Sequence, residues 1–186
     1  MYNSDINLQQ SGDWLQVIGT FLSAIAVTPN EKIDEEERVS LALLGNIFQV
    51  VGNAIEVEGP WWTETNVANE LQAIGSLAET YPILIPLSPE TTLRVEIGGN
   101  LTQSVGSGIA FVDPAQQGAL IQSGNLLQSV GTTLKAIGGK YVLREVENPE
   151  EDTEETGIEL NIAGHWVQFT GCLLAAIGDA DAQRPY

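Results

Sequence analysis

The stretch Gly124-Asn125-Leu126-Leu127-Gln128-Ser129-Val130-Gly131 decides the fold, because it or a close variant of it occurs six times in the chain. Each copy has a glutamine four residues after its first position and a glycine seven residues after it. A similar unit that recurs from end to end predicts a repeat architecture. The first positions are Gly12, Gly45, Ala68, Gly99, Gly124 and Gly164; the glutamines are Gln16, Gln49, Gln72, Gln103, Gln128 and Gln168; the second glycines are Gly19, Gly52, Gly75, Gly106, Gly131 and Gly171.

Each copy of this motif predicts one amphipathic helix. Counted from the first position as zero, apolar residues fall at positions three, six and ten, as Leu127, Val130 and Leu134 do in the fifth copy. The glycines, the glutamine and a small polar residue share the roughly opposite arc. A glycine inside a helix costs roughly 1 kcal/mol relative to alanine, so its recurrence indicates close approach of helix backbones. We interpret the motif as a helix-packing device, and a glutamine-lined groove for a polymer or peptide is the alternative.

The intervals between successive glutamines predict that the helices form pairs. The intervals are 33, 23, 31, 25 and 40 residues, and the steps from Gln16 to Gln72 and from Gln72 to Gln128 are both 56 residues. We therefore predict one all-α domain over residues 1–186, a six-helix bundle of three tandem helical hairpins with acidic loops. The expected helices lie near residues 6–27, 39–57, 63–81, 89–112, 114–138 and 157–179. The long connections lie within the pairs, over residues 28–38, 82–92 and 139–156.

Local chemistry predicts where several helices begin and end. Ser88-Pro89 and Asp113-Pro114 each place a capping side chain before a proline that suits a first helical turn. Gly138-Gly139 predicts a helix end. The apolar segment 82–87 is expected to lie extended over the helices and close the core, and residues 140–146 to form a short strand or extended arm.

Composition limits the classes of partner. The chain has a net charge of −18, with 43% apolar residues, so global disorder is not expected. Acidic runs between Glu31 and Glu37 and between Glu145 and Glu159 predict solvated loops. Seven scattered basic residues cannot form a cationic track, which argues against nucleic acid and against an anionic membrane surface. Residues 1–10 lack the pattern of a signal peptide, and one cysteine suits a reducing compartment, so we expect a cytoplasmic protein.

The sequence offers little for catalysis or metal binding. His165 occupies the motif position that holds asparagine in four other copies, which favours a polar packing role. Cys172 stands where the other copies have serine, threonine or asparagine, which favours a small filler. Asp179 and Asp181, even with the acidic residues 150–155, lack the calcium-loop pattern. We expect no enzyme, no cofactor and no metal site.

The tryptophans are the candidate contact residues. Trp61 and Trp62 are adjacent in a short linker, where one indole is available to bind a partner; the alternative is that both rings cover hairpin ends as lids. Trp14 and Trp166 occupy the same motif position in the first and last copies. Our hypothesis is that the terminal helices meet, either to close a ring or at another subunit.

A membrane interpretation also follows from the glycine spacing. Glycines seven residues apart occur in membrane helices, and residues 39–55 and 160–178 are uncharged and moderately apolar. Both stretches are marginal in length, contain amide side chains and lack the Lys or Arg flanks that orient a span. We therefore expect a soluble bundle and consider a membrane unlikely as partner, with conditional membrane insertion as the alternative.

The six motif copies resemble the uncharacterised repetitive proteins of Bacillus-like bacteria built on the same short motif, over residues 6–179. This resemblance implies no reaction, substrate or partner. Ala68 departs from glycine, and Thr102 departs from the apolar third position. We expect an acidic, soluble bacterial helical repeat protein of unknown function that acts by protein binding, as a scaffold or by self-assembly. The alternatives are a conditional membrane-inserting, pore-former-like protein and, third, a hydrolase or other enzyme.

Overall fold

The chain folds into six α-helices in a computed structural model that describes residues 2–116 and 118–183, with side chains from residue 8 onward. Within these ranges every regular element is a helix, so the predicted all-α, six-helix bundle is confirmed. The helices are α1 (Tyr2–Val27), α2 (Glu35–Ile55), α3 (Glu64–Leu84), α4 (Pro89–Val112), α5 (Ala119–Glu147) and α6 (Glu154–Ala182).

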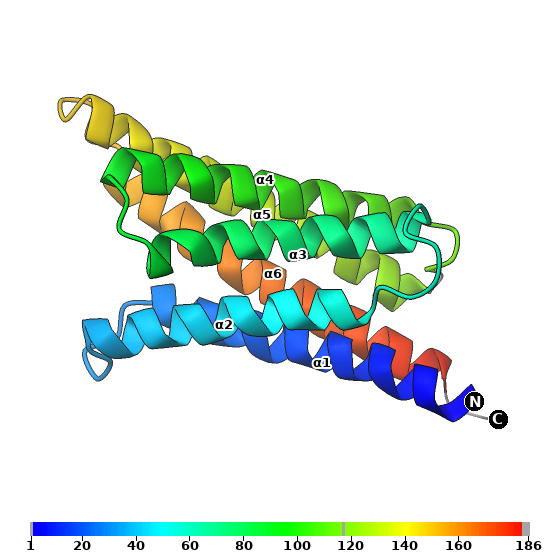
Figure 1. Cartoon of the computed structure of the whole chain (residues 1–186). Coiled ribbons are helices and arrows are strands. Elements are labelled where there is room, and N and C mark those ends of the chain that lie inside the picture. The colour runs from blue at the N-terminus through cyan, green and yellow to red at the C-terminus, as the bar shows by residue number, and fades with distance from the viewer. Residues whose placement is uncertain (1, 117, 184–186) are drawn as a thin grey trace.

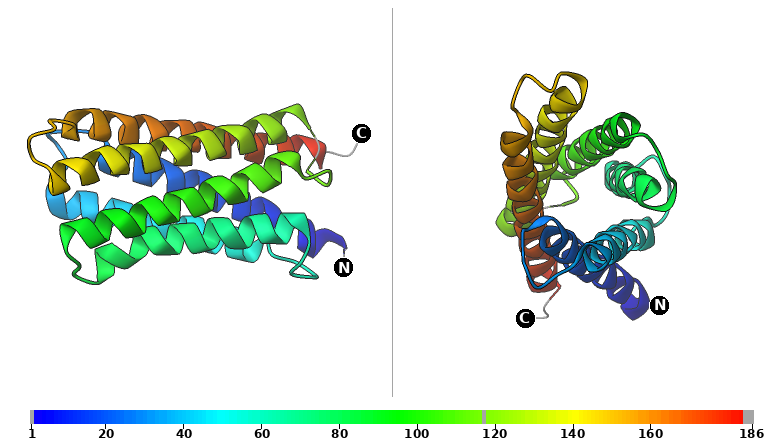
Figure 2. Two further views of the ribbon diagram at one scale, coloured as in Figure 1. Left: turned by 90° about the horizontal axis from the view of Figure 1, so that it is seen from above. Right: turned by 90° about the vertical axis from the view of Figure 1, so that its left-hand side faces the viewer.

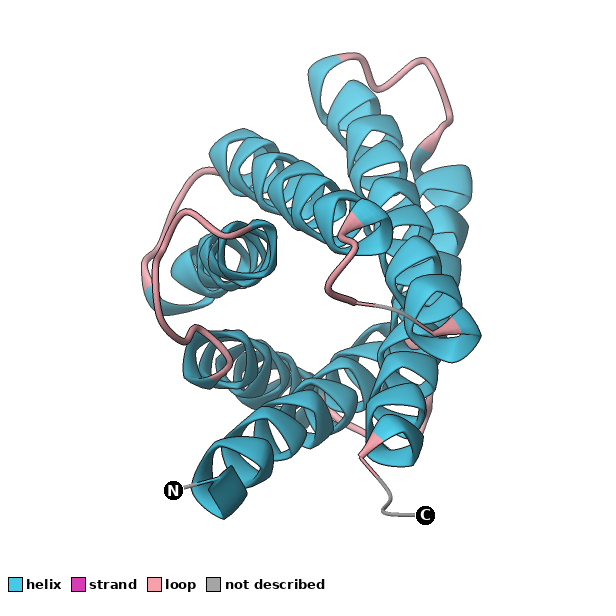
Figure 3. Cartoon of the chain, turned by 90° about the vertical axis from the view of Figure 1, so that its right-hand side faces the viewer, coloured by secondary structure: helices cyan, strands magenta, loops and turns pink. Residues whose placement is uncertain are grey.

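The helices form three antiparallel hairpins, α1–α2, α3–α4 and α5–α6, arranged in a closed ring (Figures 1 and 2). Each helix contacts the next along the chain, and α6 returns to contact α1. The view along the ring axis shows this closure directly (Figure 3). The hypothesis that the terminal helices meet to close a ring is therefore confirmed.

The two ends of the ring differ in what they carry. The three loops within hairpins, residues 28–34, 85–88 and 148–153, lie together at what we call the hairpin-loop end (Figure 1). The start of α1, the end of α6 and the connections α2–α3 and α4–α5 lie at the opposite end, which we call the terminal end (Figure 1).

The motif glycines lie where the two helices of a hairpin touch. A Cβ atom built on Gly131 would lie 2.5 Å from the backbone nitrogen of Gln168 and 2.7 Å from the carbonyl oxygen of Gly164. Only glycine permits backbones this close, which accounts for its cost within a helix. Ala68 is the exception, and its carbonyl oxygen faces Gly106. The paired glycines are Gly12 with Gly52, Gly19 with Gly45, Gly75 with Gly99, Gly124 with Gly171, and Gly131 with Gly164.

Side-chain caps begin several helices. Asp34 accepts from the backbone N–H of Glu37, and the Glu37 carboxylate accepts from the backbone N–H of Asp34, which forms a capping box at α2. Ser88 caps α4 with Pro89 in its first turn, as predicted. The corresponding prediction for Asp113-Pro114 is wrong, because α5 begins at Ala119 and Asp113 instead accepts from Thr65.

Helix α5 runs nine residues beyond its predicted end at residue 138, to Glu147. Gly138 is not a helix end, because a Cβ on it would lie 2.6 Å from the carbonyl oxygen of Gly157 on α6. The glycine is there for close packing and extends the seven-residue series of Gly124 and Gly131. Residues 140–146 are therefore helical, and the predicted strand or arm is wrong.

The apolar segment 82–87 does not close a core. Helix α3 continues through Pro82 and ends two residues later at Leu84, although the proline cannot donate a backbone hydrogen bond. Leu84 is 63% exposed and Ile85 is 42% exposed. This prediction failed because the expected core is absent here: the ring encloses polar side chains.

Candidate functional site

The interior of the ring is polar. All six motif glutamines are buried, as are the asparagines or histidine that follow the first motif position in five copies. By contrast, most of the buried apolar residues are alanines. Burial of amide groups is unfavourable unless they are hydrogen-bonded, so the interior is a network whose partners must be accounted for.

Three glutamines join the three hairpins across the axis. The Nε2 group of Gln168 on α6 donates to Oε1 of Gln49 on α2, at 3.1 Å, and to Oε1 of Gln103 on α4, at 2.9 Å. Both hydrogens of this amide are therefore used. Each of the three hairpins supplies one member of the triad.

A buried ion pair lies directly beside this triad. Nζ of Lys135 is 3.0 Å from Oε1 and 3.1 Å from Oε2 of Glu79, and it donates to Oε1 of Gln168 at 3.1 Å. Oε1 of Glu79 also accepts from Nε2 of Gln103 at 2.8 Å. Lys135 is 1% exposed and Glu79 is 7% exposed. We call these five residues, Gln49, Glu79, Gln103, Lys135 and Gln168, the central plug.

On the hairpin-loop side of the central plug lies a cavity of about 170 Å³. Glu79 and Lys135 form one wall of it, and Glu96, Asn100 and His165 are among its other lining residues. The buried Oδ1 atom of Asn100 has no hydrogen-bond partner among the described residues. A buried acceptor left unpaired costs free energy, so this cavity has room and a polar atom for a further donor.

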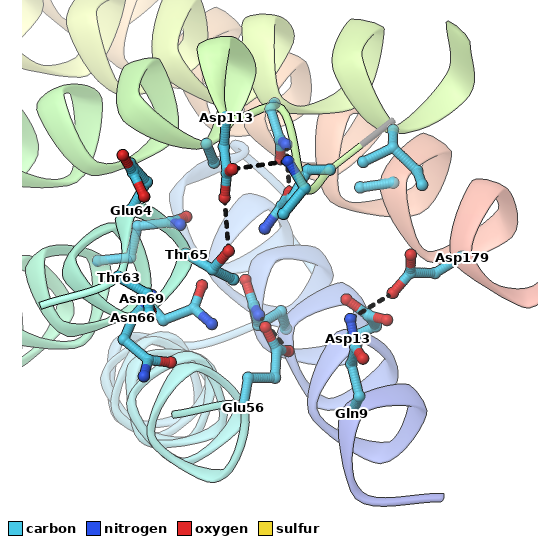
Figure 4. A pocket seen from close by; sticks show the side chains of 18 of the residues that line it. Gln9, Asp13, Glu56, Thr63, Glu64, Thr65, Asn66, Asn69, Asp113 and Asp179 are labelled. Atoms are coloured by element: carbon cyan, nitrogen blue, oxygen red, sulfur yellow. Dashed lines mark hydrogen bonds between the residues drawn. The ribbon is translucent and has the colours of Figure 1, made fainter. Parts of the chain in front are cut away.

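On the terminal side lies a larger cavity of about 400 Å³ (Figure 4). The motif glutamines of the odd-numbered helices, Gln16, Gln72 and Gln128, line it. Gln9 donates to Asp179 at 3.0 Å, and Thr65 donates to Asp113. Carboxyl groups surround the cavity, and the ionised ones give it a negative field that attracts cations. They belong to Asp13, Glu56, Glu58, Glu64, Asp113 and Asp179.

Glu56, immediately after the end of α2, is an electrostatically perturbed group at the terminal end. Burial raises the pKa of its carboxyl group above the ordinary value, the hydrogen bond from Gln16 opposes this rise, and the nearby Asp179 adds to it. Nε2 of Gln16 donates to Oε1 of Glu56 at 2.7 Å. The group therefore binds its proton more tightly in the folded protein than in the unfolded chain.

The outside of the ring is apolar. Motif positions two and six face outward, and we call these twelve residues the outer band. Ten of the twelve are large apolar side chains exposed at the surface, and the exceptions are Glu70 and Thr170. The ten are Trp14, Ile18, Ile47, Val51, Ile74, Leu101, Val105, Leu126, Val130 and Trp166.

Two helices are long and apolar enough to cross a membrane. Among the described residues these are α2 and α6, each with a mean hydropathy of 1.3 in its most apolar stretch. Length and composition alone do not identify a membrane-spanning helix, because the core helix of a soluble protein passes the same test.

The structure separates the residues that the sequence singled out. Trp61 and Trp62 are 65% and 68% exposed at the terminal end, with ring centroids 6.0 Å apart, so neither covers a hairpin end as a lid. His165 lines the smaller cavity, and Cys172 packs beside Val17 where α6 meets α1. Among residues 2–116 and 118–183, no group of three or more His, Cys, Asp or Glu is placed to hold a metal ion.

Sequence reasoning missed the ion pair, although a signal for it exists. Ser23, Glu79 and Lys135 each lie seven residues after a motif glutamine of an odd-numbered helix, and 56 residues separate one from the next. In the structure each contacts the glutamine of its own hairpin partner: Gln49 donates to Ser23, Gln103 donates to Glu79, and Lys135 donates to Gln168. A search of the positions seven residues after these glutamines would have found all three residues.

Comparison with known proteins gives a family without an assigned activity. The model of the Family of unknown function (DUF6944) matches residues 7–176. No curated protein and no solved structure matches the chain.

Proposed function

The chain belongs to this family of unknown function, so its role must be inferred from the geometry. We propose that it is a non-catalytic helical bundle embedded in a membrane, and that its interior takes up small polar solutes, mainly cations. The observation that carries the proposal is the reversed distribution of side chains, with amides and charges inside the ring and the apolar outer band outside it.

The outer band extends around the full circumference. Each of the six helices contributes at least one exposed apolar side chain to it. A protein partner would have to surround the ring to cover all six faces, whereas lipid tails cover every face at once. In water this surface would oppose folding, because apolar area removed from water is the main stabilising term for a soluble domain.

Helix length and charge placement agree with a bilayer. The shortest helices have 21 residues and are about 32 Å long, close to the roughly 30 Å of a hydrocarbon core. The ion pair of Glu79 and Lys135 lies in the interior, as ionisable groups do in membrane bundles, and exposed charged side chains such as Arg94 and Lys140 lie toward the helix ends. Glu70 is the one charged residue of the outer band, and it is partly buried.

The chemistry of the interior supports cations as the solutes. The larger cavity is surrounded by carboxylates and amide oxygens, which replace water around a small cation. The described basic residues other than Lys135 lie near the hairpin-loop end, so none of them lies at the cavity mouth. They are Lys32, Arg38, Arg94, Lys140 and Arg144.

This placement of basic residues also supports an orientation. Lys and Arg within short loops and near span ends favour the cytoplasmic side. The hairpin-loop end would then face the cytoplasm, and the carboxylate-lined cavity would open on the other side. Trp61 and Trp62 would lie at the opposite interface, where tryptophan is common in membrane proteins.

The second candidate is a cytoplasmic protein that self-assembles or serves as a scaffold, with no enzymatic activity. The net charge of −18 and Glu70 in the outer band favour it. In that case further copies or an apolar partner protein cover the outer band.

Depth-dependent fluorescence quenching separates the two candidates. The purified protein is incorporated into vesicles whose lipids carry bromine at defined positions along the acyl chain. In the Trp61→Phe/Trp62→Phe variant the remaining indoles, Trp14 and Trp166, lie in the outer band, and we expect the strongest quenching from bromine deep in the chain. In the matched Trp14→Phe/Trp166→Phe variant we expect it from bromine near the headgroups.

The scaffold candidate predicts a different result. The protein would stay in solution as a defined oligomer by light scattering, would not float with vesicles, and would show no dependence on bromine depth. That outcome would reject the membrane proposal.

A further inference from the structure

We propose that the Lys135–Glu79 ion pair is a gate: together with the glutamine triad it separates the two interior cavities, and its removal joins them into one path for cations along the ring axis. This inference rests on the proposed membrane function and deepens it, because it assigns the residues that control passage.

The position of the pair supports a gate. Glu79 and Lys135 line the smaller cavity, and their partners Gln103 and Gln168 belong to the triad that crosses the axis between the two cavities. All three hairpins meet in the central plug, so an ion that crosses the ring must pass it.

The chemistry of the pair also supports a gate. The ammonium group of Lys135 uses its three hydrogens on the two Glu79 oxygens and on Gln168, so the plug is closed by hydrogen bonds on every side. The ammonium group neutralises the Glu79 carboxylate and already occupies the position beside it that a passing cation would take. Other small cations therefore cannot pass while Lys135 holds this position.

The smaller cavity supplies an independent observation. Asn100 is 4% exposed, and its Oδ1 atom lacks a hydrogen-bond partner where the cavity borders the ion pair. This oxygen would accept a hydrogen bond from a water molecule that has passed the plug, or from the hydration shell of a cation that has done so. The closed state thus leaves an acceptor unused on the far side of the gate.

The fold itself suggests the variant that opens the gate. Ser23 occupies the equivalent position in the first hairpin, so Glu79→Ser/Lys135→Ser gives all three hairpins the same small residue. The control, Lys140→Ser/Glu151→Ser, removes one charge of each sign from exposed positions at the hairpin-loop end. Both variants keep the net charge of the chain.

The test measures K⁺ efflux from vesicles of phosphatidylcholine and phosphatidylglycerol that contain the full-length protein. We expect the gate variant to release K⁺ about tenfold faster or more than the unmodified protein, and the control to match the unmodified protein. If the gate variant incorporates with unchanged helical content and efflux does not rise, the gate is rejected and the membrane function stands.

Two further outcomes are decisive. If the serine variant does not fold, Glu79→Gln/Lys135→Gln replaces it, because glutamine keeps polar contacts while removing both charges; we then expect efflux to rise about threefold, and no rise rejects the gate. If the unmodified protein does not enter vesicles at all, both the proposed function and the gate are rejected.

Discussion

The contacts within a hairpin are made mainly by backbone atoms, whereas the contacts between hairpins are made mainly by side chains. Within a hairpin, backbone meets backbone at paired glycines, as at Gly131 and Gly164. Between hairpins, side chains fill the space: Phe21 meets Trp166 edge to face at a centroid distance of 6.2 Å, and Trp166 donates to Thr28 at 3.0 Å. The difference indicates that hairpins are rigid units and that the ring is assembled from them through replaceable side chains.

The largest expected effect concerns the buried charge pair of Lys135 and Glu79, which links two hairpins. Lys135→Met leaves Glu79 buried without its counter-ion, and we expect a loss of about 3–5 kcal/mol in the free energy of unfolding. Denaturant titration followed by helical circular dichroism measures this. Lys140→Met, at an exposed position, is the control and is expected to change little. Equal effects from the two variants would show that the pair adds nothing to the joint between hairpins.

The next effect tests the glycine contacts themselves. Gly131→Ala forces a methyl group to within 2.5 Å of backbone, which cannot move cheaply, and we expect a loss of about 2–3 kcal/mol. Gly98→Ala is the matched substitution, because a Cβ there meets no heavy atom within 4 Å. We expect it to stabilise α4 by roughly 0.5–1 kcal/mol. If both variants lose stability alike, close approach is not what selects glycine in this chain.

A smaller effect tests the side-chain contacts between hairpins. Trp166→Phe removes the hydrogen bond to Thr28 and part of the contact with Phe21 and Phe169, and we expect a loss of about 1–2 kcal/mol. Trp62→Phe, in the exposed linker, is the control and is expected to leave the thermal midpoint unchanged. A loss at Trp166 as large as that of Gly131→Ala would contradict the distinction between the two kinds of contact.

The smallest effect lies at the terminal end and depends on pH. The pKa of Glu56 is raised in the folded protein, so the folded state binds the proton more tightly, and stability falls as the pH rises from the ordinary carboxyl value through the raised one. Glu56→Gln keeps an acceptor for Gln16 without the charge. We expect it to stabilise the protein at pH 8 and to leave stability at pH 4 unchanged. Unfolding midpoints at the two pH values measure this, and equal shifts at both would contradict the assignment.

The hairpins could be predicted from the sequence because the residues that make their contacts recur at regular intervals. The 56-residue interval between Gln16, Gln72 and Gln128 identifies the three units, and glycine pairing follows from the seven-residue step. The same seven-residue step continues to Gly138. We predicted a helix end there because two adjacent glycines often end a helix, but the repeat spacing predicts a packing glycine, and the structure agrees with the spacing.

The direction of the two helix faces could not be predicted in the same way. Periodicity divides a helix into an apolar and a polar face, but which face turns inward depends on the surroundings of the bundle, which the pattern does not contain. Val130 and Gln128 illustrate this: the spacing puts them on different faces, and only the structure places the glutamine inside and the valine outside. The unpaired oxygen of Asn100 likewise depends on packing detail that no spacing rule supplies.

The repeated hairpin also bears on how wide the ring is. Each hairpin meets its neighbours through its two flanks, and the last hairpin meets the first in the same way. The turn from one hairpin to the next therefore fixes how many complete a circle, and here the number is three. A chain with a fourth copy of the 56-residue unit would need a smaller turn between hairpins and would enclose a wider interior, so copy number would set the width of the ring.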